Sequence, residues 1–228
     1  MLSILRGLDG RRKALAKKAP EGPLRQYYEV PYADPKADCR DVEYVALDLE
    51  TTGLLASKHE IVSAGWVPVR NMRVELSGCH HQLVKPDNAV SEESITIHHI
   101  FESHLEDAPT LEYMLSILLP EMAGKVMIAH HSKIEWKFID AACRKVYGQK
   151  WEIPTVDTLL IEKRMFDMRN EPIKPGSLRL DAVRQRYNMP RYKAHNAMID
   201  AIACAEVYLA QIQYRAGKEP LPLRAMTI

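Results

Sequence analysis

The chain is organised around residues 44–54, which read Tyr44-Val45-Ala46-Leu47-Asp48-Leu49-Glu50-Thr51-Thr52-Gly53-Leu54. At the two-residue period of a strand, the apolar residues at 45, 47 and 49 point one way, and Ala46, Asp48 and Glu50 point the other. Two carboxylates placed so have attachment points about 6.6 Å apart, a spacing that suits oxygen ligands for hard divalent cations. The segment Thr51-Thr52-Gly53 then breaks the strand into a turn. A bare D-x-E pattern is more often two solvated acids on a surface strand, so later acids decide between the two interpretations.

Composition and charge bound the class of protein. The 228 residues are 46% apolar and 27% charged, which is typical of one sizeable soluble domain with terminal additions. Net charge is only +1, but residues 1–20 carry six basic residues against Asp9, so an acidic body of net charge −4 follows a basic arm of +5. An acidic body that handles a polyanion would need metal ions at its site to neutralise the repulsion.

The sequence predicts a cytoplasmic protein without a membrane partner. No run approaches the roughly eighteen apolar residues of a membrane span. The four cysteines at 39, 79, 143 and 204 contain no C-x-x-C pair, so buried, reduced thiols are expected rather than zinc or redox motifs.

Periodicity and turn residues predict an α/β fold. We expect a basic helical N-terminal extension over 1–40, a domain over 41–216 and a C-terminal tail over 217–228. Three strands in an antiparallel meander, followed by strands alternating with helices, predict a mixed five-stranded sheet flanked by helices. The expected strands are 44–50, 60–67, 72–84, 125–130 and a brief one starting at 154. The expected helices are 3–18, 95–101, 111–122, 134–147, 177–187 and 196–214.

Two later acids fall where this sheet would place them near the first pair. Asp200 follows His195 by five residues at the start of the buried helix 196–214. An Asp there has an ordinary explanation in the helix dipole, but an acid on an apolar helix is expensive to bury without a cation partner. Glu135 sits one turn into the helix that follows the buried strand 125–130. Its ordinary alternative is a surface acid paired with a lysine.

These segments resemble a known family. Residues 46–54 closely resemble the first motif of the DnaQ-like 3′–5′ exonucleases, the DEDDh group of the ribonuclease H-like superfamily, and in particular the proofreading epsilon-type domain of bacterial DNA polymerase III. Ile97-His98-His99-Ile100 resembles that family's I-H-G-I segment, with His99 at the usual Gly. His195 and Asp200 fit the third motif, H-x(4)-D, and the resemblance spans roughly 41–214. The second motif, usually A-H-N-A-x-F-D, reads Ala129-His130-His131-Ser132-Lys133-Ile134-Glu135, so Glu135 stands at the family's aspartate and His131 at its asparagine.

The resemblance implies a ribonuclease H-like fold and a metal-dependent hydrolase that releases nucleoside 5′-monophosphates from the 3′ end of DNA. Two Mg²⁺ or Mn²⁺ ions about 4 Å apart would be held by four carboxylates; these are Asp48, Glu50, Glu135 and Asp200. His195 would be the general base, which predicts activity rising through roughly pH 6.5 to 8. The substrate-binding residues implied are Thr51, Thr52, Leu54, His98 and His131.

Two other functions compete with a DNA exonuclease. One is RNA 3′-end trimming by a member of the same family. The other is a non-catalytic nucleic-acid-binding or polymerase-accessory module in which Glu135 marks lost chemistry, although the retention of all four carboxylates and His195 argues against it. The resemblance also implies a DNA polymerase partner and a role in proofreading or DNA repair in the bacterial cytosol or nucleoid. Residues 218–228 contain no clamp-binding peptide of the Q-x-x-L-x-F type, which favours a stand-alone enzyme or an unspecialised proofreading-like subunit. The basic arm 1–18 either leads substrate to the site through phosphate contacts or forms a solvated helix.

Overall fold

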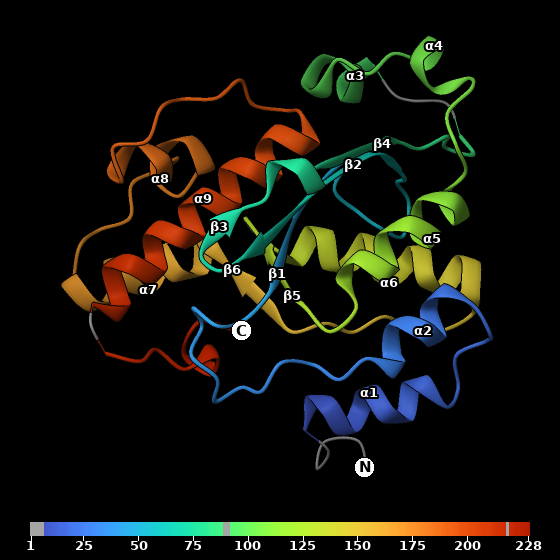
Figure 1. Ribbon diagram of the computed structural model, residues 1–228. Helices are drawn as coiled ribbons and strands as arrows, with labels where there is room; N and C mark the ends of the chain where they lie inside the picture. The colour runs from blue at the N-terminus through green and yellow to red at the C-terminus, as the bar shows by residue number, and fades with distance from the viewer. Residues whose placement is uncertain (1–6, 89–91, 218) are drawn as a thin grey trace.

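The centre of the molecule is a mixed sheet. A computed structural model of the chain describes residues 7–88, 92–217 and 219–228. The strand order is β3-β2-β1-β5-β6, with β4 also paired with β2. β1 runs antiparallel to β2 and parallel to β5, and β5 runs parallel to β6 (Figure 1). The strands are β1 Tyr44–Thr51, β2 Ile61–Arg70, β3 Arg73–Val74, β4 His80–Leu83, β5 Val126–Ala129 and β6 Thr155–Asp157. The predicted α/β class with a mixed sheet is therefore confirmed.

The predicted third strand is interrupted, which makes six strands rather than five among the described residues. β3 and β4 are separated by a 3-10 turn, η1 (Leu76–Gly78). This gap lies beside Pro68 of β2, which has no backbone N–H to donate to a neighbouring strand. The carbonyl of Pro68 instead accepts a hydrogen bond from the backbone N–H of Glu75 at 2.9 Å.

Helices cover both faces of the sheet. α5 and α6, together with α1 and α2, pack on the face that receives the odd-numbered apolar residues of β1, and α7 and α9 pack on the other (Figure 1). Asp48 and Glu50 therefore share a face with α9, as the alternation in β1 predicts. The helices are α1 Leu8–Ala16, α2 Pro23–Glu29, α3 Glu92–His98, α4 Glu102–Leu105, α5 Leu111–Met122, α6 Lys133–Tyr147, α7 Thr158–Arg169, α8 Leu180–Arg186 and α9 Ala197–Ala216, with a short 3-10 turn at Leu223–Ala225.

The N-terminal helices α1 and α2 lie toward the end of the sheet that is opposite the carboxyl ends of β1, β5 and β6. The hydroxyl of Tyr28 donates to the carbonyl of Lys150 at 2.9 Å, and that of Tyr27 donates to the carbonyl of Glu152 at 2.8 Å. Both carbonyls precede β6, so α1 and α2 (blue in Figure 1) sit below the sheet while α3 lies above it.

Both chain ends contribute to the two hydrophobic cores. Leu15, Leu24 and the two tyrosines above enter one core, and Leu223 and Met226 of the tail enter the other. In the N-terminal extension and the C-terminal tail expected from the sequence, residues 1–6 and 218 lie outside the described residues. All four cysteines are free, three buried and Cys79 half-buried. Within the described residues, no helix combines the length and apolar character needed to cross a membrane.

Candidate active site

Three carboxylates from two elements meet at the carboxyl end of β1. Asp48 and Glu50 come from β1, and Asp200 comes from the first turn of α9. One oxygen from each lies within 4.8 Å of the others. The sequence prediction that a later acid converges on the D-x-E pair is met in the geometry.

Gly65 allows this convergence. It lies on β2 directly opposite Asp48 in the antiparallel register. A Cβ built there would lie 2.2 Å from the carbonyl carbon of Ala197 and 2.2 Å from the backbone nitrogen of Met198. The first turn of α9 therefore rests on the bare backbone of β2, and this close approach brings Asp200 to the strand that carries the other two acids.

Burial raises the pKa of each of these three acids, and neighbouring carboxylates add to the rise at Asp48 and Glu50. Burial is the main cause of the raised pKa of Asp48, followed by the charges of Glu135, Glu50 and Asp200. Burial, then the charge of Asp200, raises the pKa of Glu50 to about 7. Burial also raises the pKa of Asp200. Hydrogen bonds from the backbone N–H groups of His195 (2.8 Å) and Asn196 (3.3 Å) act in the opposite direction. Clustered acids with this mutual repulsion form a donor set that fits a hard divalent cation.

Glu135 lies behind this group. It belongs to the first turn of α6, is 4% exposed, and its Oε2 atom has no hydrogen-bond partner among the described residues. Burial is the main reason why its pKa rises to about 8. It is not within the 4.8 Å group, yet its charge raises the pKa of Asp48 more than that of Glu50 or Asp200 does. A buried acid without a cation partner excludes the alternative of a surface acid paired with lysine.

Asp157 organises the second motif, and the sequence interpretation missed it. This buried residue at the end of β6 caps α7 by accepting from the backbone N–H groups of Leu159 and Leu160. It also accepts from the backbone N–H groups of His131 (3.2 Å) and Ser132 (2.9 Å) and from the Ser132 hydroxyl (2.9 Å). Asp157 thus fixes the start of α6 and with it the approach of Glu135. An Asp between a buried strand and a helix was the available signal.

Three histidines at the motifs adopt left-handed backbone conformations. The φ angles are +57° at His99, +71° at His131 and +65° at His195. This conformation explains why Gly or Asn is usual at the first two positions, since both tolerate positive φ well. His131 and His195 are both exposed.

His98 behaves differently from the sequence expectation of a substrate contact. It is 5% exposed, and both of its ring nitrogens make hydrogen bonds inside the protein, Nδ1 with the backbone N–H of Ile100 and Nε2 with Ser94. No free nitrogen is left for a base or a phosphate.

The turn after β1 is well ordered by its own hydrogen bonds. The hydroxyl of Thr51 donates to the carbonyl of Gly53 at 2.8 Å, and the backbone N–H of Thr52 donates to the carbonyl of Glu60 at 2.9 Å. The side chain of Leu54 is 75% exposed beyond it. Thr51, Thr52 and Leu54 therefore lie beside the acidic group, where the prediction places the end of the substrate.

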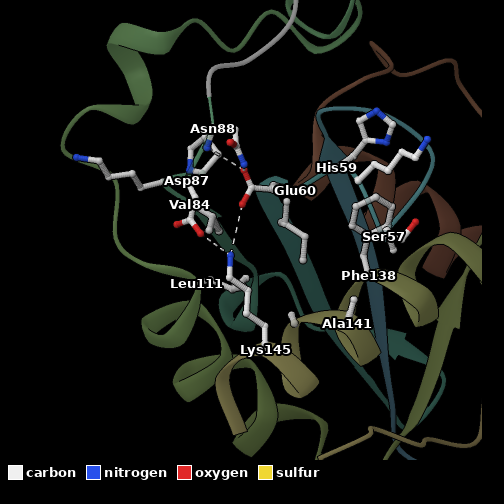
Figure 2. Close-up of a pocket in the computed structure, with 16 residues that line it drawn as sticks. Ser57, His59, Glu60, Val84, Asp87, Asn88, Leu111, Phe138, Ala141 and Lys145 are labelled. Carbon is white, nitrogen blue, oxygen red and sulfur yellow. Dashed lines mark hydrogen bonds and ion pairs between the residues drawn. The ribbon is translucent and has the colours of Figure 1, made fainter. Parts of the chain in front are cut away.

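A cavity of about 330 Å³ lies on the far side of this turn (Figure 2). Lys145 of α6 crosses it, with its Nζ 2.6 Å from Asp87 and 3.5 Å from Glu60. Glu60 also accepts from the backbone N–H of Asn88 at 3.0 Å. None of the four site carboxylates lines this cavity. Its ion pairs connect the segment that follows the turn to α6 and have a structural role.

Comparison with known proteins places the chain in a family. A family model described as exonuclease, RNase_T, matches residues 45–208. The chain belongs to this exonuclease family. The prediction of a DnaQ-like 3′–5′ exonuclease, an enzyme, is thereby confirmed.

Two bacterial relatives are similar to this exonuclease in sequence, and they differ in the share of their own length that the match covers. It is 31% identical over 180 residues to the DNA polymerase III subunit epsilon of Escherichia coli strain K12, covering 73% of this chain and 70% of that subunit. It is 30% identical over 173 residues to the PolC-type DNA polymerase III of Thermotoga maritima, covering 76% of this chain. The match spans only 12% of the length of that PolC-type polymerase.

Solved structures share the fold. The nuclease domain of 3′hExo, described as a DEDDh family member bound to rAMP, has a TM-score of 0.65 at 16% identity, covering 81% of this chain and 98% of that one. Exonuclease X in complex with 5′ overhanging duplex DNA has a TM-score of 0.58 at 20% identity, covering 80% of this chain and 98% of that one. The predicted ribonuclease H-like architecture is confirmed.

Proposed function

We propose that this exonuclease hydrolyses phosphodiester bonds from the 3′ end of DNA, preferring single-stranded or frayed ends, and releases nucleoside 5′-monophosphates with two Mg²⁺ or Mn²⁺ ions. The observation that carries the proposal is the group formed by Asp48, Glu50 and Asp200, whose oxygens lie within 4.8 Å, with the buried, unpaired Glu135 behind it. Bound divalent cations would polarise the phosphodiester and lower the pKa of the attacking water.

The other roles belong to the chain itself. The four carboxylates hold the cations. His195, which is exposed and joined to Asp200 through its backbone N–H, accepts the proton of the attacking water at a ring nitrogen. This requires a neutral imidazole, which is why we expect activity to rise through roughly pH 6.5 to 8. Backbone groups of Thr51 and Thr52 and the exposed side chain of Leu54 seat the terminal nucleotide, with His131 beside it.

Product analysis tests this proposal. Matched single-stranded DNA, duplex DNA and RNA of one sequence, labelled at the 3′ end, should be compared with Mg²⁺ and with Mn²⁺. We expect labelled 5′-mononucleotides, fastest from single-stranded DNA, and loss of product for Asp48→Ala with the fold retained. Asp181→Asn is the matched control, because Asp181 occupies the first turn of α8 as Asp200 does in α9 but lies outside the acidic group. Faster release from RNA would favour the trimming function, and no release from any substrate would favour a non-catalytic module.

A second basic segment is better placed than the N-terminal arm to meet the substrate. Residues 169–196 contain seven Lys and Arg against two acids, a net charge of +5 that equals that of residues 1–20. The segment ends at His195, and the carbonyl of Leu178 bonds with the ring of His130 in the second motif at 2.8 Å. Five of its cations are exposed and form no ion pair with any described residue; they are Arg169, Lys174, Arg179, Arg191 and Lys193. The helix α1, by contrast, lies toward the opposite end of the strands, away from their carboxyl ends (Figure 1).

We infer that this segment, the basic rim (residues 169–196), contacts the phosphates of the substrate strand. The double variant Arg191→Ala, Lys193→Ala should reduce the salt slope of oligonucleotide binding by about 1.4, because each contact to a single strand contributes about 0.7. The matched double variant Lys17→Ala, Lys18→Ala, exposed at the end of α1, should leave the slope unchanged. The reverse result would indicate that the N-terminal arm, and not the basic rim, contacts the phosphates of the substrate.

We also propose a bacterial cytosolic or nucleoid location and a DNA polymerase partner, with proofreading or DNA repair as the role. The epsilon subunit named above supports this, since it is a subunit of DNA polymerase III. Co-elution of the chain with a purified replicative polymerase tests the partner, and separate elution at micromolar concentration would favour a stand-alone exonuclease.

A further inference from the structure

Helix α3 is fastened to the end of β1 through two buried polar side chains. Ser94 and His98 are 4% and 5% exposed and lie four residues apart, which places them on one face of the helix. The Ser94 hydroxyl lies 2.6 Å from Nε2 of His98 and donates to the carbonyl of Thr51 at 3.3 Å. The backbone N–H of Ile100 donates to Nδ1 of His98 at 3.1 Å.

These contacts fix the direction of every hydrogen bond in the series. Because Nδ1 accepts from Ile100, it carries no proton, and the neutral ring therefore has its proton on Nε2. Nε2–H donates to the Ser94 oxygen, whose own proton is directed to the carbonyl of Thr51. Burial is the main cause of the lowered pKa of His98, followed by the charges of His99 and His195, and this keeps the ring neutral. We call this series the Ser94–His98 relay.

The relay ends at the point where β1 becomes the turn. The register with β2 shifts between Glu50 and Thr51, and the carbonyl of Thr51, the last residue of β1, accepts the hydrogen bond from Ser94. Behind the turn, the ring of His59 packs so closely on Gly53 that a Cβ there would lie 2.6 Å from it. The turn is therefore supported by His59 on one side and by the relay from α3 at its start.

We propose that Ser94 and His98 are positioning residues that hold the turn Thr51–Leu54 in the shape that seats the terminal nucleotide of the substrate. The proposal rests on the proposed function of the same site. Neither residue touches the reacting atoms, because both are buried and their polar atoms are used within the relay. Their effect should appear in nucleotide binding and not in the hydrolytic step.

Two half-isosteres of histidine separate the two ends of the relay. In His98→Asn the amide oxygen replaces Nδ1 and keeps the bond to Ile100 but loses Ser94, whereas in His98→Gln the amide nitrogen replaces Nε2 and keeps the donor to Ser94. Ser94→Ala removes the central link. Ser116→Ala is the matched control, because the Ser116 hydroxyl donates to a carbonyl of its own helix, that of Tyr113, at 2.7 Å.

The kinetic experiment compares an oligonucleotide with bis(p-nitrophenyl) phosphate, which has no nucleoside. For Ser94→Ala and His98→Asn we expect the oligonucleotide KM to rise about fivefold to tenfold, the loss expected for one buried neutral hydrogen bond, with kcat within about twofold. Hydrolysis of bis(p-nitrophenyl) phosphate should be unchanged, and His98→Gln and Ser116→Ala should resemble the wild type. Wild-type KM in both relay variants, or an equal fall of activity on both substrates, would overturn the proposal.

A measurement that needs no activity separates failure of the relay from failure of the proposed function. The ¹⁵N spectrum of the His98 ring should show the Nε2–H tautomer in the wild type and also in Ser94→Ala, because the bond from Ile100 to Nδ1 is kept, with a shifted Nε2 signal in the variant because Nε2–H has lost its acceptor. A proton on Nδ1 in the wild type would refute the relay. A wild-type chain that shows the expected tautomer but hydrolyses neither substrate would refute the proposed function and, with it, the positioning role in catalysis.

Discussion

Replacing Glu50 with glutamine should flatten the loss of stability that the metal-free protein undergoes as the pH rises. Burial, then the charge of Asp200, holds the pKa of Glu50 at about 7 instead of 4.5. The folded state therefore keeps a proton on Glu50 that the unfolded state releases, so the contribution of Glu50 to stability falls as the pH rises from about 4.5 to about 7 and changes little above that range. The interval corresponds to about 3 kcal/mol lost from the free energy of unfolding.

The measurement is the urea-unfolding free energy in chelator at several pH values between about 5 and 8, for wild type and Glu50→Gln. The wild type should lose about 2.5 kcal/mol more than the variant across this range. Glu112→Gln, at an exposed position in the first turn of α5, should follow the wild type. Added Mn²⁺ should restore wild-type stability most strongly at the upper end of the range, because the cation binds the ionised acids. Parallel curves for wild type and Glu50→Gln would refute the account of the acidic group.

Three further changes test how the site is built. Gly65→Ala should cost about 2–3 kcal/mol of stability by denaturant unfolding and abolish nuclease activity, because its Cβ would push α9 and Asp200 off the sheet; wild-type stability would show that the helix can yield. Asp157→Asn should cost about 2–3 kcal/mol and lower the affinity for Mn²⁺, because an amide cannot accept all five hydrogen bonds; unchanged Mn²⁺ titration would limit it to a helix cap. Glu135→Asp should weaken Mn²⁺ binding about tenfold in a titration followed by electron paramagnetic resonance, because the shorter side chain brings its carboxylate less close to Asp48. Equal Mn²⁺ affinity of the wild type and the variant would contradict this role of the longer side chain.

The features that sequence predicted well depend on local signals. The alternation in β1 placed Asp48 and Glu50 on the face opposite the apolar residues, and Thr110 with the apolar stripe after it gave the bounds of α5 as observed. Gly148, with φ of +66°, ends α6 as predicted. In each case the physical cause lies within a few residues of the chain, so a pattern can reveal it.

The features that sequence missed depend on pairing between distant segments. The role of Asp157 exists only because β6 lies beside β5, which puts its carboxylate against the start of α6. The close approach at Gly65 requires α9 to lie across β2, about 130 residues later in the chain. The packing of Tyr27 and Tyr28 onto carbonyls near residue 150 gives α1 and α2 a structural place that their basic composition did not indicate.

The same distant pairing explains why a glutamate suits position 135. Asp157 holds the backbone of His131 and Ser132, so the start of α6 is drawn toward β6, which is separated from β1 by β5. The carboxylate on the first turn of α6 therefore approaches Asp48 of β1 from the helix that follows β5. The additional methylene of glutamate extends that reach by about 1.5 Å. The charge of Glu135 contributes to the raised pKa of Asp48, so the two carboxyl groups are near enough to interact. We propose that Glu135, which lies outside the group of three carboxylates within 4.8 Å, serves as a fourth carboxylate when a cation is bound.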